Sequence, residues 1–176
     1  MNNPYFSSTQ LWRIPRAAVE DSLDEMALDG DNGHEGIVLW LGKDTGEIAE
    51  ITHLIRLRGS LVEKRKDFIN IHPPLLNDVA DVAIEYGIRL VGQVHSHGPG
   101  YGVDLSPTDR MYGIQAPFYL SLVAPDYART RAPIHEWGAH VYTCEGGYIR
   151  LSNAKARCCL QITGDPRPPM LTVGGV

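Results

Sequence analysis

The stretch "VGQVHSHGPGYGVDLSPTD", from Val91 to Asp109, places two histidines at the end of an apolar run. A glycine-rich loop follows, and Ser-Pro-Thr-Asp then begins an expected helix with Ser106 as its cap. Alternate side chains of a strand share a face, so His95 and His97 should point to the same side. If the loop folds the helix back towards the strand end, the carboxylate of Asp109 joins the two imidazoles.

Such a group of side chains is typical of a metal site. Two histidines and one carboxylate, with a position left for water, form the coordination of catalytic zinc, whereas structural zinc has four protein ligands. Ser106 is placed to donate a hydrogen bond to a developing oxyanion. Asp104 remains an alternative to Asp109 as third ligand, although no serine precedes Asp104 by three residues.

The motif resembles that of the JAMM (MPN+) metalloproteases, a family that includes deubiquitinases. Their pattern is an upstream Glu before an apolar strand, then His-x-His, and then Ser-x-x-Asp. The matching residues here are Glu35, His95, His97, Ser106 and Asp109. The resemblance implies that Glu35 is the general base and that Ser106 stabilises the oxyanion. It also implies one catalytic Zn²⁺ bound by His95, His97 and Asp109.

The chain departs from this family in its loops. Eight residues separate His97 from Ser106, where the family has about seven, and Gly98-Pro99 stands where many members have proline. Glycine follows Glu35 immediately, as Gly36, instead of as the third residue. We therefore expect loops of a different shape around the same ligands.

The hydrophobic pattern predicts an α/β (α+β) class with a single mixed sheet flanked by helices. Helices are expected at 14–30, at 73–87 and from Ser106, and strands at 36–42, 45–55, 88–97, 118–124 and 137–144. Region 56–71 is expected to be an insertion or a flexible loop, and 164–176 a flexible C-terminal tail. We expect one domain over 1–176. The resemblance implies an MPN/JAMM fold, whose layers are similar to those of cytidine deaminases.

Composition restricts the classes of function. The chain has 176 residues and is 43% hydrophobic, enough for a substantial core, and its net charge of −5 argues against nucleic acid as a partner. It has no signal peptide pattern and no apolar stretch near the ~18 residues of a membrane span, so we expect no membrane partner and a cytoplasmic location. Cys144, Cys158 and Cys159 are expected to be reduced thiols, with a second metal site as the alternative.

The resemblance also implies a function: a zinc-dependent isopeptidase or peptidase. It would hydrolyse the bond after the C-terminal glycine of a ubiquitin-like protein, in deconjugation or precursor processing. Similar bacterial enzymes act with activating and conjugating enzymes, some in antiviral defence, so we expect such partners. The alternatives are a sulfur-carrier protein as substrate, a zinc hydrolase of small amides, and a non-catalytic MPN scaffold.

Overall fold

The computed structural model describes residues 9–175. Its strands are β1 (Leu11–Pro15), β2 (Ile37–Asp44), β3 (Ile48–Leu57), β4 (Val62–Lys64), β5 (Ile69–Ile71), β6 (Arg89–Ser96), β7 (Leu120–Ala124), β8 (Gly138–Thr143), β9 (Gly147–Arg150), β10 (Leu160–Thr163) and β11 (Met170–Val173). Its helices are α1 (Arg16–Gly30), α2 (Pro73–Tyr86), α3 (Pro107–Tyr112) and α4 (Asn153–Cys159), with short 3₁₀ turns η1 (Asp126–Ala128) and η2 (Ile134–Glu136).

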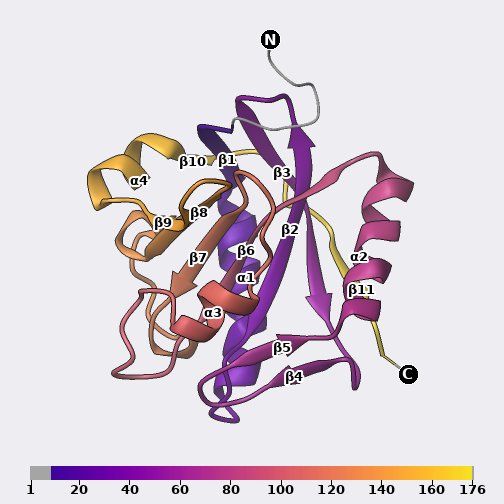
Figure 1. Cartoon of the computed structure of the whole chain (residues 1–176), viewed down its shortest axis with the longest axis vertical. Coiled ribbons are helices and arrows are strands. Elements are labelled where there is room, and N and C mark those ends of the chain that lie inside the picture. The colour runs from indigo at the N-terminus through magenta and orange to yellow at the C-terminus, as the bar shows by residue number, and fades with distance from the viewer. Residues whose placement is uncertain (1–8, 176) are drawn as a thin grey trace.

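One curled, mixed sheet forms the centre of the molecule (Figure 1). Eight strands follow the order β10-β1-β3-β2-β6-β7-β8-β9, and β11 pairs with β3 beyond the part that β1 occupies. Parallel pairs such as β6–β7 stand beside antiparallel pairs such as β2–β6. The expected class, a mixed sheet flanked by helices, is confirmed. No helix in the described part of the chain is both long and apolar enough to cross a membrane.

Strand β2 is buried on both faces because helices cover both sides of the sheet. Val38 and Trp40 belong to the core that includes α1, and the Trp40 indole donates a hydrogen bond of 3.0 Å to the Ser22 hydroxyl of that helix. Leu39 and Leu41 belong to a second core that includes α2. In Figure 1, α1 crosses one face of the sheet, while α2 and α3 lie on the other. The side chains of His95 and its neighbour Ser96 therefore enter different layers.

Region 56–71, expected as an insertion or a flexible loop, is instead an ordered hairpin of β4 and β5, and β3 extends to Leu57. Val62, Ile69 and Ile71 pack against the core that includes α2. The Lys64 ammonium lies 2.7 Å from the Asp29 carboxylate of α1. Each strand has three residues, too few for the alternating pattern to stand out in the sequence.

The expectation of a flexible tail over 164–176 is wrong for its central part. Residues 170–173 form β11, whose Leu171 pairs with Ile55 of β3 in parallel register. Val173 is 5% exposed and packs in the core that includes α2. Proline and glycine dominate the composition of this segment, but four residues between them are enough to complete the sheet.

Candidate metal centre

Strand β6 carries both histidines between two neighbouring strands. His95 pairs with Ile37 of β2 and with Val123 of β7, and the His97 amide donates to the carbonyl of Ala124. His95 is 2% exposed and His97 is 4% exposed. Their Nε2 atoms lie 3.2 Å apart, so the strand alternation brings the two imidazoles together as expected.

The cap of α3 brings Asp109 to this pair. The Asp109 amide donates to the Ser106 hydroxyl oxygen at 3.1 Å, and the Ser106 amide donates to Asp109 Oδ2 at 2.8 Å. The same Oδ2 atom lies 3.4 Å from His97 Nε2 and 3.7 Å from His95 Nε2. Among residues 9–175, these three form the one group of His, Cys, Asp or Glu side chains arranged to hold a metal ion.

The hydrogen bonds of the His97 ring are compatible with a role as a metal ligand. Its Nδ1 lies 3.1 Å from the carbonyl of Gly102, which can only accept, so Nδ1–H donates. Nε2 faces Asp109: it donates to that carboxylate when the ring is protonated, and in the neutral ring it offers a lone pair to a metal ion. Burial lowers the pKa of His97, but the hydrogen bond with Asp109 and nearby negative charge raise it on balance. Burial likewise opposes ionisation of Asp109, but hydrogen bonds from His95 and His97 hold the pKa of that carboxyl well below its ordinary value.

Ser96, the residue between the two histidines, positions Glu35 beside this group through hydrogen bonds with Gly36. Ser96 is fully buried and points to the opposite face, where its hydroxyl accepts a 2.9 Å hydrogen bond from the Gly36 amide. The Ser96 amide in turn donates to the Gly36 carbonyl at 2.9 Å. A Cβ on Gly36 would stand 2.7 Å from Cα of Met26, so α1 requires glycine immediately after Glu35. Packing against α1 therefore explains why glycine follows Glu35 directly, where the JAMM pattern has it two residues later.

Glu35 is a buried acidic residue beside this group, and its carboxyl forms no side-chain hydrogen bond with residues 9–175. Glu35 is 3% exposed, and burial raises its pKa to about 8, with His97 opposing that rise and Asp109 adding to it. The structure therefore brings Glu35 within electrostatic reach of both residues. A buried, unpaired carboxyl with a perturbed pKa beside possible metal ligands indicates a functional group.

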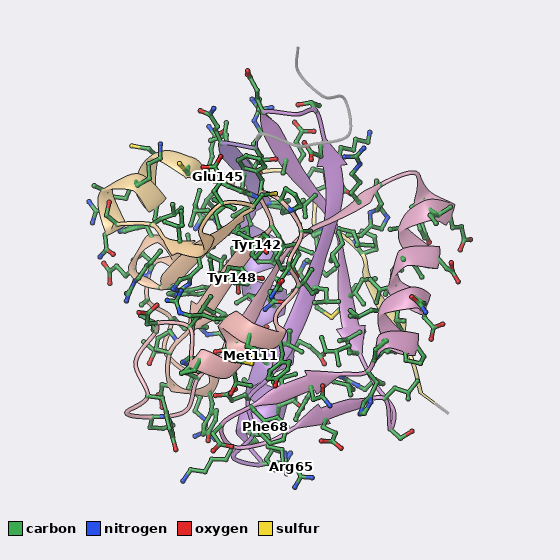
Figure 2. All side chains as sticks on the ribbon, viewed as in Figure 1. Arg65, Phe68, Met111, Tyr142, Glu145 and Tyr148 are labelled. Atoms are coloured by element: carbon green, nitrogen blue, oxygen red, sulfur yellow. The ribbon has the colours of Figure 1, made fainter. Side chains whose placement is uncertain are left out.

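Hydrogen bonds with the β4–β5 hairpin and with η1 fix the backbone at Glu35 and His97. The Glu35 amide donates to the Arg65 carbonyl, in the hairpin turn where the Arg65 guanidinium lies over the Phe68 ring (Figure 2). Tyr127 donates its amide to the His97 carbonyl at 2.7 Å and its hydroxyl to the Lys66 carbonyl at 3.2 Å. Residues 126–128 all have positive φ, a strained arrangement that these contacts maintain.

Asp104, the alternative third ligand, faces away from the histidine pair. Its carboxylate accepts hydrogen bonds from His140 Nε2 at 2.7 Å and from Arg110 at 2.9 Å. His140 is completely buried on β8 and thereby ties the long loop between His97 and Ser106 to the sheet. The sequence gives no signal of this pair, because the two residues lie 36 positions apart.

The structure also gives the positions of the cysteines. Cys144 and Cys158 are exposed, Cys159 is buried, and all three are free thiols. None belongs to the group of described residues that could hold a metal ion.

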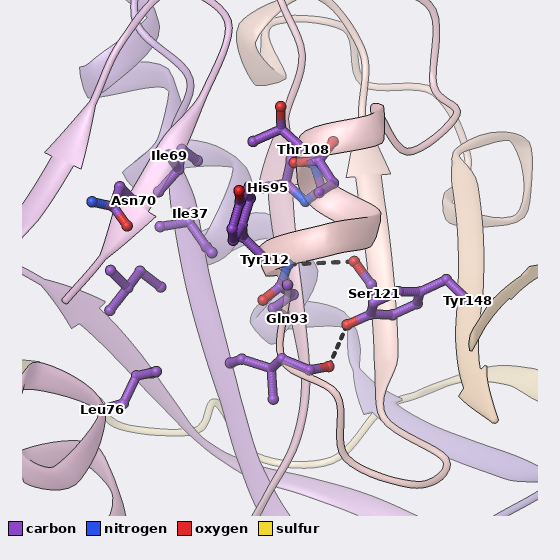
Figure 3. Close-up of a pocket in the computed structure, with 14 residues that line it drawn as sticks. Ile37, Ile69, Asn70, Leu76, Gln93, His95, Thr108, Tyr112, Ser121 and Tyr148 are labelled. Carbon is purple, nitrogen blue, oxygen red and sulfur yellow. Dashed lines mark hydrogen bonds and ion pairs between the residues drawn. The ribbon is translucent and has the colours of Figure 1, made fainter. Parts of the chain in front are cut away.

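A cavity of about 80 Å³ extends from the metal centre between the hairpin and α3 (Figure 3). Ile69, Asn70 and Ile71 of β5 form one side. Thr108, Asp109 and Tyr112 of α3 form the other. Gln93 and Ser121 line it on the strands beneath. His95 and Asp109 therefore border an open space within the protein.

Comparisons with known proteins bear on the fold. No protein-family model matches the sequence, and no curated protein matches it either. The solution structure of protein DSY2949 from Desulfitobacterium hafniense is similar, with a TM-score of 0.64 over 88% of this chain and 94% of that chain. The two sequences are 13% identical. That likeness shows a shared fold and says nothing about activity.

Proposed function

We propose that this protein is a zinc-dependent peptidase or isopeptidase of the JAMM (MPN+) type. The observation that carries the proposal is the buried group of His95, His97 and Asp109 with the buried Glu35 carboxyl beside it. Ligand atoms about 2.0–2.2 Å from a tetrahedral zinc ion lie roughly 3.3–3.6 Å from one another. The three separations, 3.2, 3.4 and 3.7 Å, lie within about 0.1 Å of that range.

The chemistry divides between the ion and the side chains. When bound, zinc would polarise a water molecule and a substrate carbonyl. Glu35 would accept a proton from the attacking water and transfer it to the leaving amine as the C–N bond breaks. A neighbouring dication would also favour the ionised form of Glu35 that this role requires.

Ser106 is fixed for the remaining task. Its hydroxyl oxygen already accepts from the Asp109 amide, so its hydrogen is free to donate. A hydrogen bond from this group to the carbonyl oxygen would stabilise the negative charge that develops there. Because the same residue caps α3, its position does not depend on the substrate.

The substrate that the cleft best accommodates is an extended tail ending in glycine. Strand β5 pairs only with β4 among residues 9–175, so its other edge can bind an extended peptide by main-chain hydrogen bonds. β5 and α3 bound the cavity on opposite sides, which favours a residue without a Cβ next to the metal. A ubiquitin-like protein has such a tail, and an activating and a conjugating enzyme would be its partners.

The test uses zinc-loaded protein and a panel of ubiquitin-like proteins with a C-terminal glycine, each fused to a small reporter. We expect cleavage after the glycine and its loss with a chelator. Glu35→Gln should lower the rate at least about 100-fold and leave zinc bound, because it removes the proton acceptor alone. Hydrolysis of a small glycine anilide with all fusions intact would favour the small-amide alternative. Bound zinc without any hydrolysis would favour a scaffold.

A further inference from the structure

The cavity beside the metal centre has a polar floor that the proposed hydrolysis does not use. Gln93 lies two residues before His95 on β6, so the two side chains share a face of the sheet roughly 7 Å apart along the strand. Ser121, on the adjacent strand β7, is the register partner of Gln93. Both line the cavity, at 8% and 1% exposure respectively.

The hydrogen bonds of this floor leave donors unused. The Tyr119 hydroxyl donates to Gln93 Oε1 at 3.0 Å, which fixes the orientation of the amide. Gln93 Nε2 then donates one hydrogen to the Ser121 hydroxyl oxygen at 3.3 Å (Figure 3). The second amide hydrogen and the Ser121 hydroxyl hydrogen have no acceptor among residues 9–175. Buried donors without acceptors are unfavourable, so the floor suits an incoming acceptor.

The walls restrict the charge of that acceptor. Five aliphatic residues line the cavity: Ile37, Ile69, Ile71, Leu76 and Ile114. The Tyr148 hydroxyl already donates to the Ile114 carbonyl and adds no further donor. No lysine or arginine lines the cavity to pair with a buried carboxylate, so a carboxylate is disfavoured. A cationic side chain would face donors, and an aliphatic one would leave them unpaired.

The volume restricts the length of the side chain. One water molecule needs about 10–15 Å³ on the same measure, so a cavity of about 80 Å³ has room for roughly five to eight such groups. That space fits a short side chain better than a second peptide segment or a large ring.

We propose that Gln93 and Ser121 form a subsite for a short, neutral side chain that accepts hydrogen bonds, namely asparagine or glutamine at the substrate residue before the terminal glycine. The proposal rests on the proposed hydrolysis after a C-terminal glycine. The glycine lies at the metal end, beside His95, and the side chain of the preceding residue enters the cavity towards Gln93. The residue before the terminal glycine of the tail is therefore polar and is not a second glycine.

The test compares peptides with zinc-loaded protein. The probes are N-acetyl-Leu-Arg-Xaa-Gly-7-amino-4-methylcoumarin peptides in which Xaa is Asn, Gln, Asp, Leu or Gly. Asn, Asp and Leu have similar shapes and differ in charge and hydrogen bonding. We expect kcat/KM at least about tenfold higher for Asn or Gln than for Leu and Asp, because a site built to hydrogen-bond rejects an analogue that cannot. Equal values would overturn the subsite.

Variants connect the preference to these residues. Gln93→Leu should reverse the ratio of Asn to Leu peptides, and Ser121→Ala, which is the gentler change, should shift it in the same direction by a few-fold. Gln161→Leu makes the same substitution at an exposed position of β10 and should keep the original ratio. An unchanged ratio in both Gln93→Leu and Ser121→Ala would contradict the proposal.

A binding measurement separates this proposal from the proposed function. Titration of ¹⁵N-labelled protein with N-acetyl-Asn-Gly and N-acetyl-Leu-Gly should show tighter binding of the Asn peptide and shifts at the Gln93 side-chain amide. Such binding with no hydrolysis of any peptide would retain the subsite and overturn the hydrolase. Hydrolysis of the peptides with no preference for Asn over Leu, in the rates or in the binding, would retain the hydrolase and overturn the subsite.

Discussion

Asp109 has two functions that a single carboxylate can combine. One oxygen accepts a hydrogen bond from the Ser106 amide at the start of α3, and the same oxygen lies among the imidazole nitrogens. The capping interaction removes rotamer freedom from the side chain before any ion binds. Less entropy is then lost on binding than for a ligand on a flexible side chain.

Replacing this carboxylate tests its place in the site. Asp109→Asn should weaken zinc binding at least about 100-fold, since an amide oxygen lacks the charge that balances the ion. The measurement is a competition titration with a chromophoric chelator. Asp104→Asn is the matched control, because Asp104 pairs with His140 and Arg110 and should leave zinc affinity close to that of the unmodified protein. A larger loss from the Asp104 change would reassign the third ligand.

At this scale the sequence predicted the local arrangements. Strand alternation gave the pairing of His95 with His97, and the Ser-x-x-Asp spacing gave the cap that positions Asp109. The roles of Ser96 and Tyr127 could not be predicted, because each depends on a contact with a residue about 60 positions away in the chain. A lone serine or tyrosine on an apolar strand or turn carries no signal of such a partner.

At the scale of elements, two hydrogen bonds between Ser96 and Gly36 connect the end of β6 to the start of β2. Ser96→Ala leaves the buried Gly36 amide without an acceptor and should lower the free energy of unfolding by about 1–3 kcal/mol. Urea denaturation measures the change. Ser60→Ala, at an exposed position, should alter the stability by less than about 0.5 kcal/mol. Equal effects of the two substitutions would show that the link contributes little.

The connection between β8 and the loop before α3 predicts a pH dependence. Burial lowers the pKa of His140 below 6.5, although the hydrogen bond with Asp104 opposes this. The unfolded chain therefore takes up a proton that the folded protein resists, and stability from this group is lost as the pH falls below that value. From about pH 7.5 to about pH 5.5, His140→Gln should lose less stability than the unmodified protein, measured by urea denaturation.

His135→Gln is the control for this pH experiment, since His135 lies near the surface with Glu136 as its neighbour. This variant should lose as much stability on acidification as the unmodified protein. The His140 interpretation would be wrong if both variants gave the same curve.

The elements themselves were predictable in proportion to their length and pattern. The helix at 73–87 has prolines at its start and Gly87 with a φ of 64° at its end, and both signals are local. The strands β4, β5 and β11 have three or four residues and are stabilised by contacts with α2 and β3, which no short window of sequence contains. The pattern therefore identified long elements and missed short ones that depend on tertiary packing.

Across the whole molecule, β11 joins the C-terminal segment to the core between the sheet and α2. Val173→Ala should lower the free energy of unfolding by about 1–3 kcal/mol, because it removes buried apolar surface and leaves a small cavity. Thermal and urea denaturation measure this. Thr172→Ala on the exposed side of the same strand should change stability by less than half as much. Similar losses would indicate that strand pairing, not core packing, provides the stabilisation.

The last described residues lie against the beginning of the hairpin that borders the cavity. A Cβ on Gly59 would stand 2.8 Å from the backbone nitrogen of Gly175, and a Cβ on Gly174 would stand closer still to the Arg58 carbonyl oxygen. A purification tag or fused reporter joined after Gly175 would start beside Arg58 and Gly59, at the beginning of the hairpin whose strand β5 lines the cavity. Assays of the proposed hydrolysis therefore call for a tag ahead of β1, which leaves this side of the hairpin unobstructed.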